Sequence, residues 1–310
     1  MRWKARLAVL WLFAMASISL GFSAPTHAAR TPDKSYLIGL KAPGQGTVRL
    51  YAEEHGRGRP VLLLHGLGAS TFTWRNIIPT LARRHRVIAL DLKGFGRSEK
   101  PFTQAYSPYD HANLVLAFIR KRGLRNITIV GHSFGGAIAM MVTLRLNETN
   151  PGRVRDLVLM NAPTYPQPRT KFIDFMNAPV LPYAALMMVP PVLSTWLSLD
   201  EIQARKLSRQ EVRGYADPFY DSAARHALIT TARRIEPKHV DSLIARYPTV
   251  RQRTLIIWCE ADHTVPLATG QRLVHELPNA RLKVLTGCGH VPQDERPKAV
   301  KRLITAFLNR

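Results

Sequence analysis

Short apolar runs alternate with longer amphipathic stretches along most of this chain. The runs are VLLLH (61–65), VIALDL (87–92), ITIVGHS (127–133), LVLMNA (157–162), LIIWCEAD (255–262) and LKVLTG (282–287). Continuous apolar runs of this length are typical of strands that are buried on both faces, and helix-length segments between them indicate crossover connections. The pattern therefore predicts a mostly parallel central sheet flanked by helices, which is an α/β fold.

Helical spacing of apolar residues fills most of the gaps between these runs. It occurs over 71–84, 108–122, 133–147 and 294–309, with Pro108 and Asp294 near the expected helix starts. Ahead of the first buried run, the segments YLIGL and TVRLYAEEHG predict an opening hairpin.

The alternation stops after Ala162 and resumes near the run LIIW. Residues 163–240 are rich in helix-forming residues and contain Pro and Met, but they lack the pattern of a buried strand. We expect them to form a helical cap inserted into a single domain. The predicted organisation is a first core segment at 29–162, the cap at 163–240, a second core segment at 241–310, and a separate leader at 1–28.

The leader has the pattern of an export signal. Arg2, Lys4 and Arg6 precede the acid-free apolar run LAVLWLFAMASISLGF, and small residues before Ala29 offer a cleavage point. We therefore expect a periplasmic or secreted protein. The apolar run of 16 residues is shorter than the roughly 20 residues of a membrane span, and an uncleaved membrane anchor is the alternative interpretation.

Basic residues are spread over the whole chain. The 310 residues include 44 Lys and Arg against 21 Asp and Glu, and removal of residues 1–28 still leaves a net charge of +20. No zinc-finger, RNA-binding or basic-zipper pattern accompanies this charge, so we expect no nucleic-acid partner. An anionic membrane surface is the expected partner, and a charge without any specific partner is the alternative.

The sequence GHSFGG, residues 131–136, joins a predicted strand to a predicted helix. A serine on such a sharp turn needs glycine on both sides, because a Cβ atom there would collide with the neighbouring strand or helix. Gly131 and Gly135 supply that room, and Ser133 becomes the candidate nucleophile. The GxSxG pattern alone is weak evidence, and its place between strand and helix carries the interpretation.

A serine hydroxyl needs a base to take its proton, and the base needs a carboxylate to orient it. Chemistry on parallel sheets takes place at the carboxyl ends of the strands, so the partners should directly follow apolar runs. His290 follows LKVL and Asp262 follows LIIW, whereas Asn161 occupies the end of the preceding strand. We therefore predict a catalytic triad of Ser133, Asp262 and His290.

Several separate motifs together resemble the α/β-hydrolase family, in particular its large group of serine hydrolases with a helical cap. The motifs are HGLG (65–68), DLKGFGRS (91–98), GHSFGG (131–136), WCEADHTVP (258–266) and GHVPQDERP (289–297). The resemblance implies that the backbone amides of Leu67 and Phe134 form an oxyanion hole, and that His65 and the DLKGFGRS loop have structural roles. It implies no cofactor and no metal.

Cys259 and Cys288 are the only cysteines of the chain. They lie three residues before Asp262 and two before His290, so they should be close in space if that acid and base meet. An even number of cysteines in an exported chain, without metal-ligand spacing, predicts a disulfide. Cys259 also stands where the family usually has glycine. Two buried free thiols are the alternative.

The expected activity is hydrolysis of a small-molecule carboxylic ester by an esterase or lipase. Met187, Met188 and Trp196 of the predicted cap suit an apolar acyl chain or alcohol, unless they only pack the cap onto the core. One alternative is a carbon–carbon bond hydrolase or perhydrolase with the same triad. Another is a ligand-binding member of the fold without catalysis. The sequence does not indicate an oligomeric state.

Overall fold

The computed structural model describes residues 31–310, and the predicted export segment at 1–28 lies outside the described residues. The strands are β1 (Lys34–Ala42), β2 (Gly46–His55), β3 (Arg59–Leu64), β4 (His85–Leu90), β5 (Ile127–His132), β6 (Val154–Met160), β7 (Arg253–Cys259) and β8 (Ala280–Leu285). The helices are η1 (Thr71–Trp74), α2 (Ile78–Leu81), α3 (Pro108–Lys121), α4 (Phe134–Thr149), α5 (Lys171–Asn177), α6 (Leu181–Met188), α7 (Pro191–Ile202), α8 (Arg209–Ala216), η2 (Asp217–Tyr220), α9 (Ser222–Arg233), α10 (Val240–Ile244), η3 (Tyr247–Thr249), α11 (Leu267–Glu276), α12 (Pro292–Glu295) and α13 (Pro297–Leu308).

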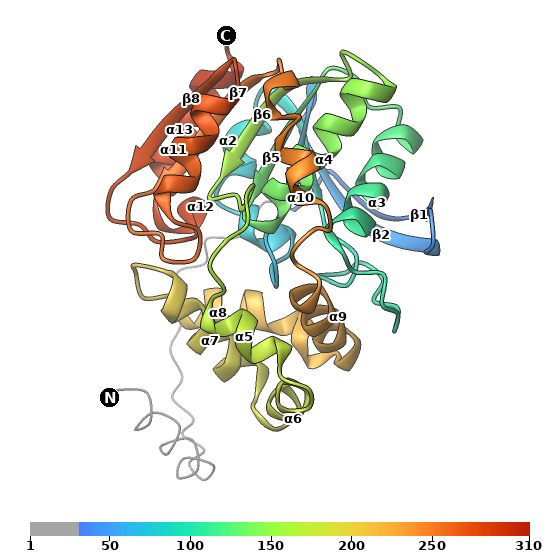
Figure 1. The fold of residues 1–310 in the computed structure, drawn as a ribbon, viewed down its shortest axis with the longest axis vertical. Helices are drawn as coiled ribbons and strands as arrows, with labels where there is room; N and C mark the ends of the chain where they lie inside the picture. Colours follow the sequence, from blue (N-terminus) through green and yellow to red (C-terminus); the bar gives the residue numbers. More distant parts are fainter. Residues whose placement is uncertain (1–30) are drawn as a thin grey trace.

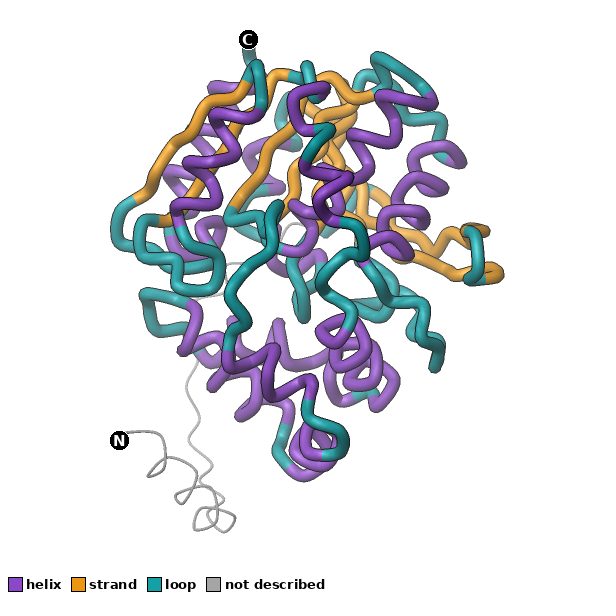
Figure 2. The backbone as a smooth tube through the Cα atoms, in the orientation of Figure 1, coloured by secondary structure: helices purple, strands orange, loops and turns teal. Residues whose placement is uncertain are grey.

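Within this part of the chain, the strands form one sheet in the order β1-β2-β4-β3-β5-β6-β7-β8 (Figures 1 and 2). The strands β1, β2 and β4 pair antiparallel, and every pair from β4 to β8 is parallel. The sheet is therefore the mostly parallel one that the apolar runs predicted, and β1 and β2 form the predicted opening hairpin.

Helices cover both faces of the sheet because successive strand residues point to opposite sides. In β3, Leu62 and Leu64 belong to the cluster that also contains α3 and α4, whereas Val61 and Leu63 belong to the cluster under α2 and α13. All four side chains are fully buried. The apolar run in β3 is continuous because alternate residues pack into different hydrophobic cores, one on each face of the sheet.

The structure corrects three local predictions. The strand β8 is not buried on both faces, because it forms the edge of the sheet and exposes Lys283 and Val284. The helix expected at 71–84 consists of two short pieces, η1 and α2. The helix expected at 294–309 is divided at Arg296, because Pro297 begins the new helix α13.

The chain between β6 and β7 holds the helices α5 to α9, which lie together in the lower part of Figure 1. They face the carboxyl ends of the parallel strands, because one cavity is lined by Ser133, directly after β5, and by residues of α5, α6, α7 and α9. We refer to this body as the cap. Its limits at residues 163 and 240 stay a prediction.

Candidate active site

The predicted nucleophile stands alone between strand and helix. The strand β5 ends at His132, the helix α4 begins at Phe134, and Ser133 between them has φ 50° and ψ −125°. A Cβ atom on Gly131 would lie 2.4 Å from the carbonyl oxygen of Gly135, and one on Gly135 would lie 2.3 Å from that of Leu64. Glycine is therefore required at both positions for this turn to form.

Three side chains from separate loops meet beside this turn. The Nε2 atom of His290 lies 2.8 Å from the Oγ atom of Ser133, and its Nδ1 atom lies 2.8 Å from the Oδ2 atom of Asp262. His290 is 4% exposed and Asp262 is 5% exposed. A carboxylate that accepts from Nδ1–H leaves Nε2 without a proton, and in this tautomer the ring can accept the serine proton.

Asp262 is held in its ionised form by several donors. Its Oδ1 atom accepts the backbone N–H of Thr264 at 2.8 Å and of Val265 at 3.0 Å, and its Oδ2 atom accepts from Nδ2 of Asn161 at 2.5 Å. Burial by itself would raise the pKa of Asp262, but the electrostatic interaction and hydrogen bond with His290 and the other hydrogen bonds lower it below its usual value. Asn161 is thus a partner of the carboxylate.

The backbone of His290 is fixed on both sides. Its N–H donates to the carbonyl oxygen of Ile202, at the end of α7, at 2.8 Å. Its own carbonyl oxygen accepts from Nε2–H of His132 at 2.8 Å. Burial, together with the charge of His290, lowers the pKa of His132 to about 3, so His132 stays neutral and acts as a donor. The predicted base, His290, is therefore hydrogen-bonded to the core through His132 and to the cap through Ile202.

The carboxylate of Glu295 accepts hydrogen bonds from three backbone N–H groups in and near this loop. Its Oε2 atom accepts from Gly289 at 2.9 Å and from Ala204 at 2.7 Å, and its Oε1 atom accepts from Val291 at 2.9 Å. Two of these donors flank His290, and the third belongs to the cap directly after α7. One buried carboxylate thus joins the cap to the loop that carries the base.

A second polar cluster fastens the cap nearby. The carboxylate of Asp294 accepts from the hydroxyl of Tyr215 in α8 and forms an ion pair of 2.9 Å with Arg75 in the core. Arg75 also contacts Glu211 of α8 at 2.8 Å. Because these groups are largely buried and mutually paired, the cluster holds α8 against the core beside the GHVPQDERP segment.

The predicted oxyanion-hole residues border the same space. Leu67 and Phe134 line the cavity with Ser133 and His290. Phe134 is the first residue of α4, so its N–H has no acceptor within the helix and the positive end of the helix dipole is directed at this point. The donor role of the two amides stays a prediction.

His65 shapes the backbone at Leu67. Its Nδ1–H donates to the carbonyl oxygen of Gly66 at 2.8 Å, and its Nε2 accepts the N–H of Leu92 at 2.9 Å. Burial lowers the pKa of His65 to about 4, so the ring is neutral and both nitrogens are used. The HGLG turn is thereby fastened to the DLKGFGRS loop.

The DLKGFGRS loop is built around the buried carboxylate of Asp91. Its two oxygens accept the N–H groups of Thr71 at 2.6 Å and Arg97 at 2.8 Å. The hydroxyl of Ser98 donates to the carbonyl oxygen of Asp91 at 2.6 Å. Asp91 does not line the cavity that contains Ser133, which agrees with a structural role for this loop.

Cys259 and Cys288 are joined by a disulfide, with their Cα atoms 5.3 Å apart. The bridge connects the end of β7, three residues before Asp262, to the loop that leads into His290. The predicted disulfide is therefore present in the structure, and the alternative of two free thiols is not. No group of three or more His, Cys, Asp or Glu within residues 31–310 is arranged to hold a metal ion.

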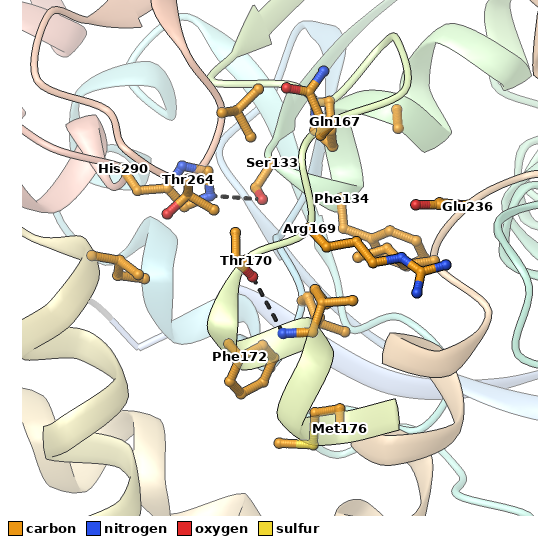
Figure 3. A pocket seen from close by; sticks show the side chains of 18 of the residues that line it. Ser133, Phe134, Gln167, Arg169, Thr170, Phe172, Met176, Glu236, Thr264 and His290 are labelled. Carbon is orange, nitrogen blue, oxygen red and sulfur yellow. Dashed lines mark hydrogen bonds between the residues drawn. The ribbon is translucent and has the colours of Figure 1, made fainter. Parts of the chain in front are cut away.

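The cavity in front of Ser133 has a volume of about 630 Å³, which is within the size range of small-molecule sites. Its wall opposite the triad is formed mainly by apolar side chains of the cap and of the segments around it: Phe172, Ile173, Met176, Leu186, Leu199, Phe219, Leu228, Ile235 and Leu243. In Figure 3, Phe172 lies below the pair of Ser133 and His290, and Met176 lies farther down and to the right. The charged side chains Arg169 and Glu236 of the lining are solvent-exposed, so charge is concentrated at the rim.

Comparison with known proteins identifies the family. The sequence model of the alpha/beta hydrolase fold matches residues 59–297. The chain belongs to the α/β-hydrolase family. This α/β-hydrolase is 30% identical over 286 residues to the 2-hydroxymuconate semialdehyde hydrolase of Pseudomonas sp. (strain CF600), covering 89% of this chain and 96% of that protein.

Solved structures resemble this α/β-hydrolase over most of its length. An alpha/beta hydrolase fold protein from Burkholderia ambifaria is 27% identical with a TM-score of 0.74, covering 85% of this chain and 94% of that one. The meta-cleavage product hydrolase CumD from Pseudomonas fluorescens IP01 is 27% identical with a TM-score of 0.73, covering 88% and 97%.

Sequence reasoning missed the groups that support the triad in this α/β-hydrolase. From the sequence, Asn161 only fills the end of a strand, and His132 and Glu295 are only members of the motifs GHSFGG and GHVPQDERP. The adjacent positions of Asp294 and Glu295, in a segment that is otherwise expected to start a helix, were the available signal. Their partners in the cap, Tyr215 and Ala204, lie 79 or more residues away in the chain, so no local pattern could reveal these contacts.

Proposed function

We propose that this protein is a serine hydrolase that cleaves carboxylic esters with an apolar acyl or alcohol part. The observation that carries the proposal is the contact of 2.8 Å between Ser133 Oγ and His290 Nε2 at the base of a large cavity with an apolar wall. A hydroxyl paired with a neutral imidazole is an activated nucleophile. An apolar wall binds an apolar chain through the hydrophobic effect.

The proposed reaction has two halves. Ser133 Oγ attacks the ester carbonyl while His290 Nε2 takes its proton, and the amides of Leu67 and Phe134 stabilise the negative oxygen. The bond to the alcohol oxygen then breaks, and His290 returns the proton to the departing alcohol. Water then attacks the acyl-enzyme while His290 takes one of its protons. The bond between the acyl carbon and Ser133 Oγ breaks, His290 returns the proton to Oγ, and the acid leaves. Asp262 orients the imidazole and stabilises the positive charge that forms when His290 takes a proton.

Hydrolysis of a carbon–carbon bond is the second candidate function. It is favoured by the relatives named above, which are hydrolases of 2-hydroxymuconate semialdehyde and of a meta-cleavage product. The same nucleophile and base would serve such a ketone substrate. The apolar wall and the exposed position of the charged lining residues support an ester with an apolar chain over a substrate that carries a carboxylate deep in the site. A perhydrolase with this triad is a variant of the same mechanism.

We also propose that the protein works outside the cytosol. The cationic and then apolar leader supports export, and the disulfide supports a compartment in which thiols become oxidised. Cell fractionation with an antibody against the protein tests this. Recovery of the protein with the cytosolic fraction would contradict it.

A fluorophosphonate reagent tests the mechanism, and a substrate panel then tests the class. We expect one adduct per chain, located on Ser133 by peptide mass, and no adduct on the folded variant Ser133→Ala. The wild type should hydrolyse p-nitrophenyl esters, with kcat/KM rising as the acyl chain grows from acetate toward longer chains. Labelling without ester turnover, together with cleavage of a vinylogous diketone, would assign the carbon–carbon reaction instead. Absence of labelling in folded protein would remove the nucleophile assignment.

A further inference from the structure

The outer end of the cap carries an unusual concentration of exposed apolar side chains. Between Asp174 and Asp200 the chain contains no Lys, Arg, Asp or Glu. Seven of the twelve large hydrophobic residues that are exposed within the described chain lie in this stretch, and they are Val180, Leu181, Met187, Met188, Leu193, Trp196 and Leu197. We call these residues the cap tip. A clustered apolar surface of this kind marks a binding surface, whereas single exposed apolar residues need no explanation.

The two helices of the cap tip are sharply bent relative to each other. No single helix in residues 31–310 is long and apolar enough to cross a membrane, but α6 and α7 pass that test together, with a bend of 117° between them. A pair bent in this way does not form a straight span. Two short apolar helices can instead lie in the plane of a lipid surface, with their apolar faces at the boundary between headgroups and acyl chains.

The helix α7 separates the cap tip from the catalytic cavity. Its residues Ser194, Thr195, Ser198 and Leu199 line the cavity. Leu193, Trp196 and Leu197, on the remaining face, are exposed. In Figure 1, α6 lies at the end of the cap farthest from the sheet, and its residues Leu181, Met187 and Met188 are exposed. A surface that binds there would be one helix away from the candidate site.

The charge of the molecule indicates which surface fits. The chain without residues 1–28 has a net charge of +20, which attracts the protein to anionic surfaces over about a Debye length. The exposed Arg169 precedes the uncharged stretch, and the exposed Lys206 and Arg209 follow it. The acidic residues Asp174, Asp200 and Glu201 lie at the two ends of the stretch, and Arg205 is paired with Glu211. Cations beside an apolar patch with an exposed Trp are the composition of segments that bind at anionic lipid interfaces.

We propose that the cap tip is a docking surface for a bilayer that contains anionic phospholipid. Met187, Met188 and Trp196 enter the boundary between headgroups and acyl chains, and the flanking cations contact the headgroups. This inference does not depend on the proposed ester hydrolysis, because docking is measured without turnover.

Trp196 offers a direct probe of this contact. Among the described residues the other tryptophans, Trp74 and Trp258, are fully buried. Vesicles of phosphatidylglycerol and phosphatidylcholine in equal parts, with brominated acyl chains, should quench fluorescence of the full chain. The same measurement on Trp196→Phe gives the quenching that comes from other tryptophans, including Trp3 and Trp11 in the leader. Subtracting it from the wild-type value leaves the quenching of Trp196. We expect quenching from Trp196 at low salt and less of it at high salt.

A variant pair tests the apolar contribution. Met187→Ser with Met188→Ser changes two side chains that are each 76% exposed and do not line the cavity, so turnover of a soluble p-nitrophenyl ester should be unchanged. The vesicle concentration that half-saturates the Trp196 quenching should rise about tenfold or more, because two side chains no longer leave water. The control pair Leu37→Ser with Val284→Ser, exposed elsewhere on the surface, should leave it within about twofold.

Three results would overturn the proposal. The first is quenching that is the same in Trp196→Phe as in the wild type. The second is equal quenching of Trp196 by vesicles of phosphatidylcholine alone. The third is a dimer, detected by light scattering, that buries Trp196 and is abolished by the Met187→Ser and Met188→Ser pair, without quenching by vesicles. That outcome would assign the cap tip to a second copy of the chain.

Discussion

The loops that carry Ser133, Asp262 and His290, here called the triad edge, contrast with the cap tip. At the triad edge, buried side chains and backbone groups are tied by hydrogen bonds from the sheet, from neighbouring loops and from the cap. The cap tip has no charged residue, and its largest apolar side chains are exposed. The hydrogen bonds of the triad edge fix the relative positions of its side chains, whereas the cap tip exposes apolar side chains to its surroundings. The two regions should therefore respond to different changes.

The largest expected effect is loss of turnover on changing the orienting acid. Asp262→Asn keeps the shape of the side chain but cannot hold the His290 tautomer that accepts a proton from serine, so kcat for a p-nitrophenyl ester should fall roughly 10³- to 10⁴-fold. KM should change far less. Met188→Ser at the cap tip, assayed in parallel, should keep kcat within about twofold. Unchanged turnover in a folded Asp262→Asn variant would place the acid elsewhere.

Removal of the disulfide should act on stability. The bridge closes a loop with a sequence separation of 29 residues, so replacing both cysteines with Ser should lower the free energy of unfolding by about 3 to 4 kcal/mol on the chain-entropy account. Urea denaturation without reductant measures this. Thiol titration of unfolded, unreduced wild type should find no reactive thiol. Two reactive thiols per chain in exported material would contradict the bridge.

Glu295 joins the triad edge to the cap near the end of α7, and its substitution should affect kcat more than KM. Glu295→Gln removes the charge and offers one acceptor oxygen where three backbone N–H groups are satisfied, so the His290 loop should shift. We expect kcat to fall about 10- to 100-fold with little change in KM, because a small displacement of the base affects the reaction more than binding. Glu148→Gln, an exposed carboxylate on α4, is the matched control. An equal loss in both variants would argue against a positioning role.

The smallest expected effect concerns pH. Burial lowers the pKa of His111 to about 3, whereas an unfolded histidine has a pKa of about 6.5. The unfolded chain therefore binds a proton that the native state does not, and stability falls as pH drops below about 6.5. His111→Phe, which fits a site beside Phe95 and Phe134, should flatten the fall by about 1 kcal/mol between about pH 6 and pH 5. Parallel curves of unfolding free energy for the variant and the wild type would contradict this. Met188→Ser should leave the dependence of the unfolding free energy on pH unchanged.

Much of the fold could be predicted because its signals are local. Fully buried strands leave continuous apolar runs, and the turn at Ser133 leaves glycines, since only glycine fits against Leu64 and Gly135. The exposure of β8 could not be predicted from its own apolar residues, because it depends on the place of the strand at the end of the sheet. The helix break at Arg296 had a local signal in the following proline, which restricts the residue before it.

The sequence predicted the three central residues of the candidate site, the glycines of the turn at Ser133 and the disulfide beside it, but not the groups that support the triad. The triad residues follow strands whose carboxyl ends must meet at one edge, so sheet topology is sufficient to bring them together. Their supports are different. The contact of His290 with Ile202 and that of Glu295 with Ala204 cross from the core to the cap, and the orientation of the cap on the core is not encoded in any short motif.

The several roles of α7 restrict how its length can change in evolution. Its inner residues line the cavity, its outer residues belong to the cap tip, and its last residue, Ile202, accepts a hydrogen bond from the loop of the base. Each residue turns an α-helix by about 100°. A one-residue insertion or deletion within α7 would therefore rotate part of the helix by about 100° and move some lining residues away from the cavity. Length changes should be tolerated only in the connections at Pro190 and after Ala204, and substrate preference should diversify through substitutions at fixed helix length.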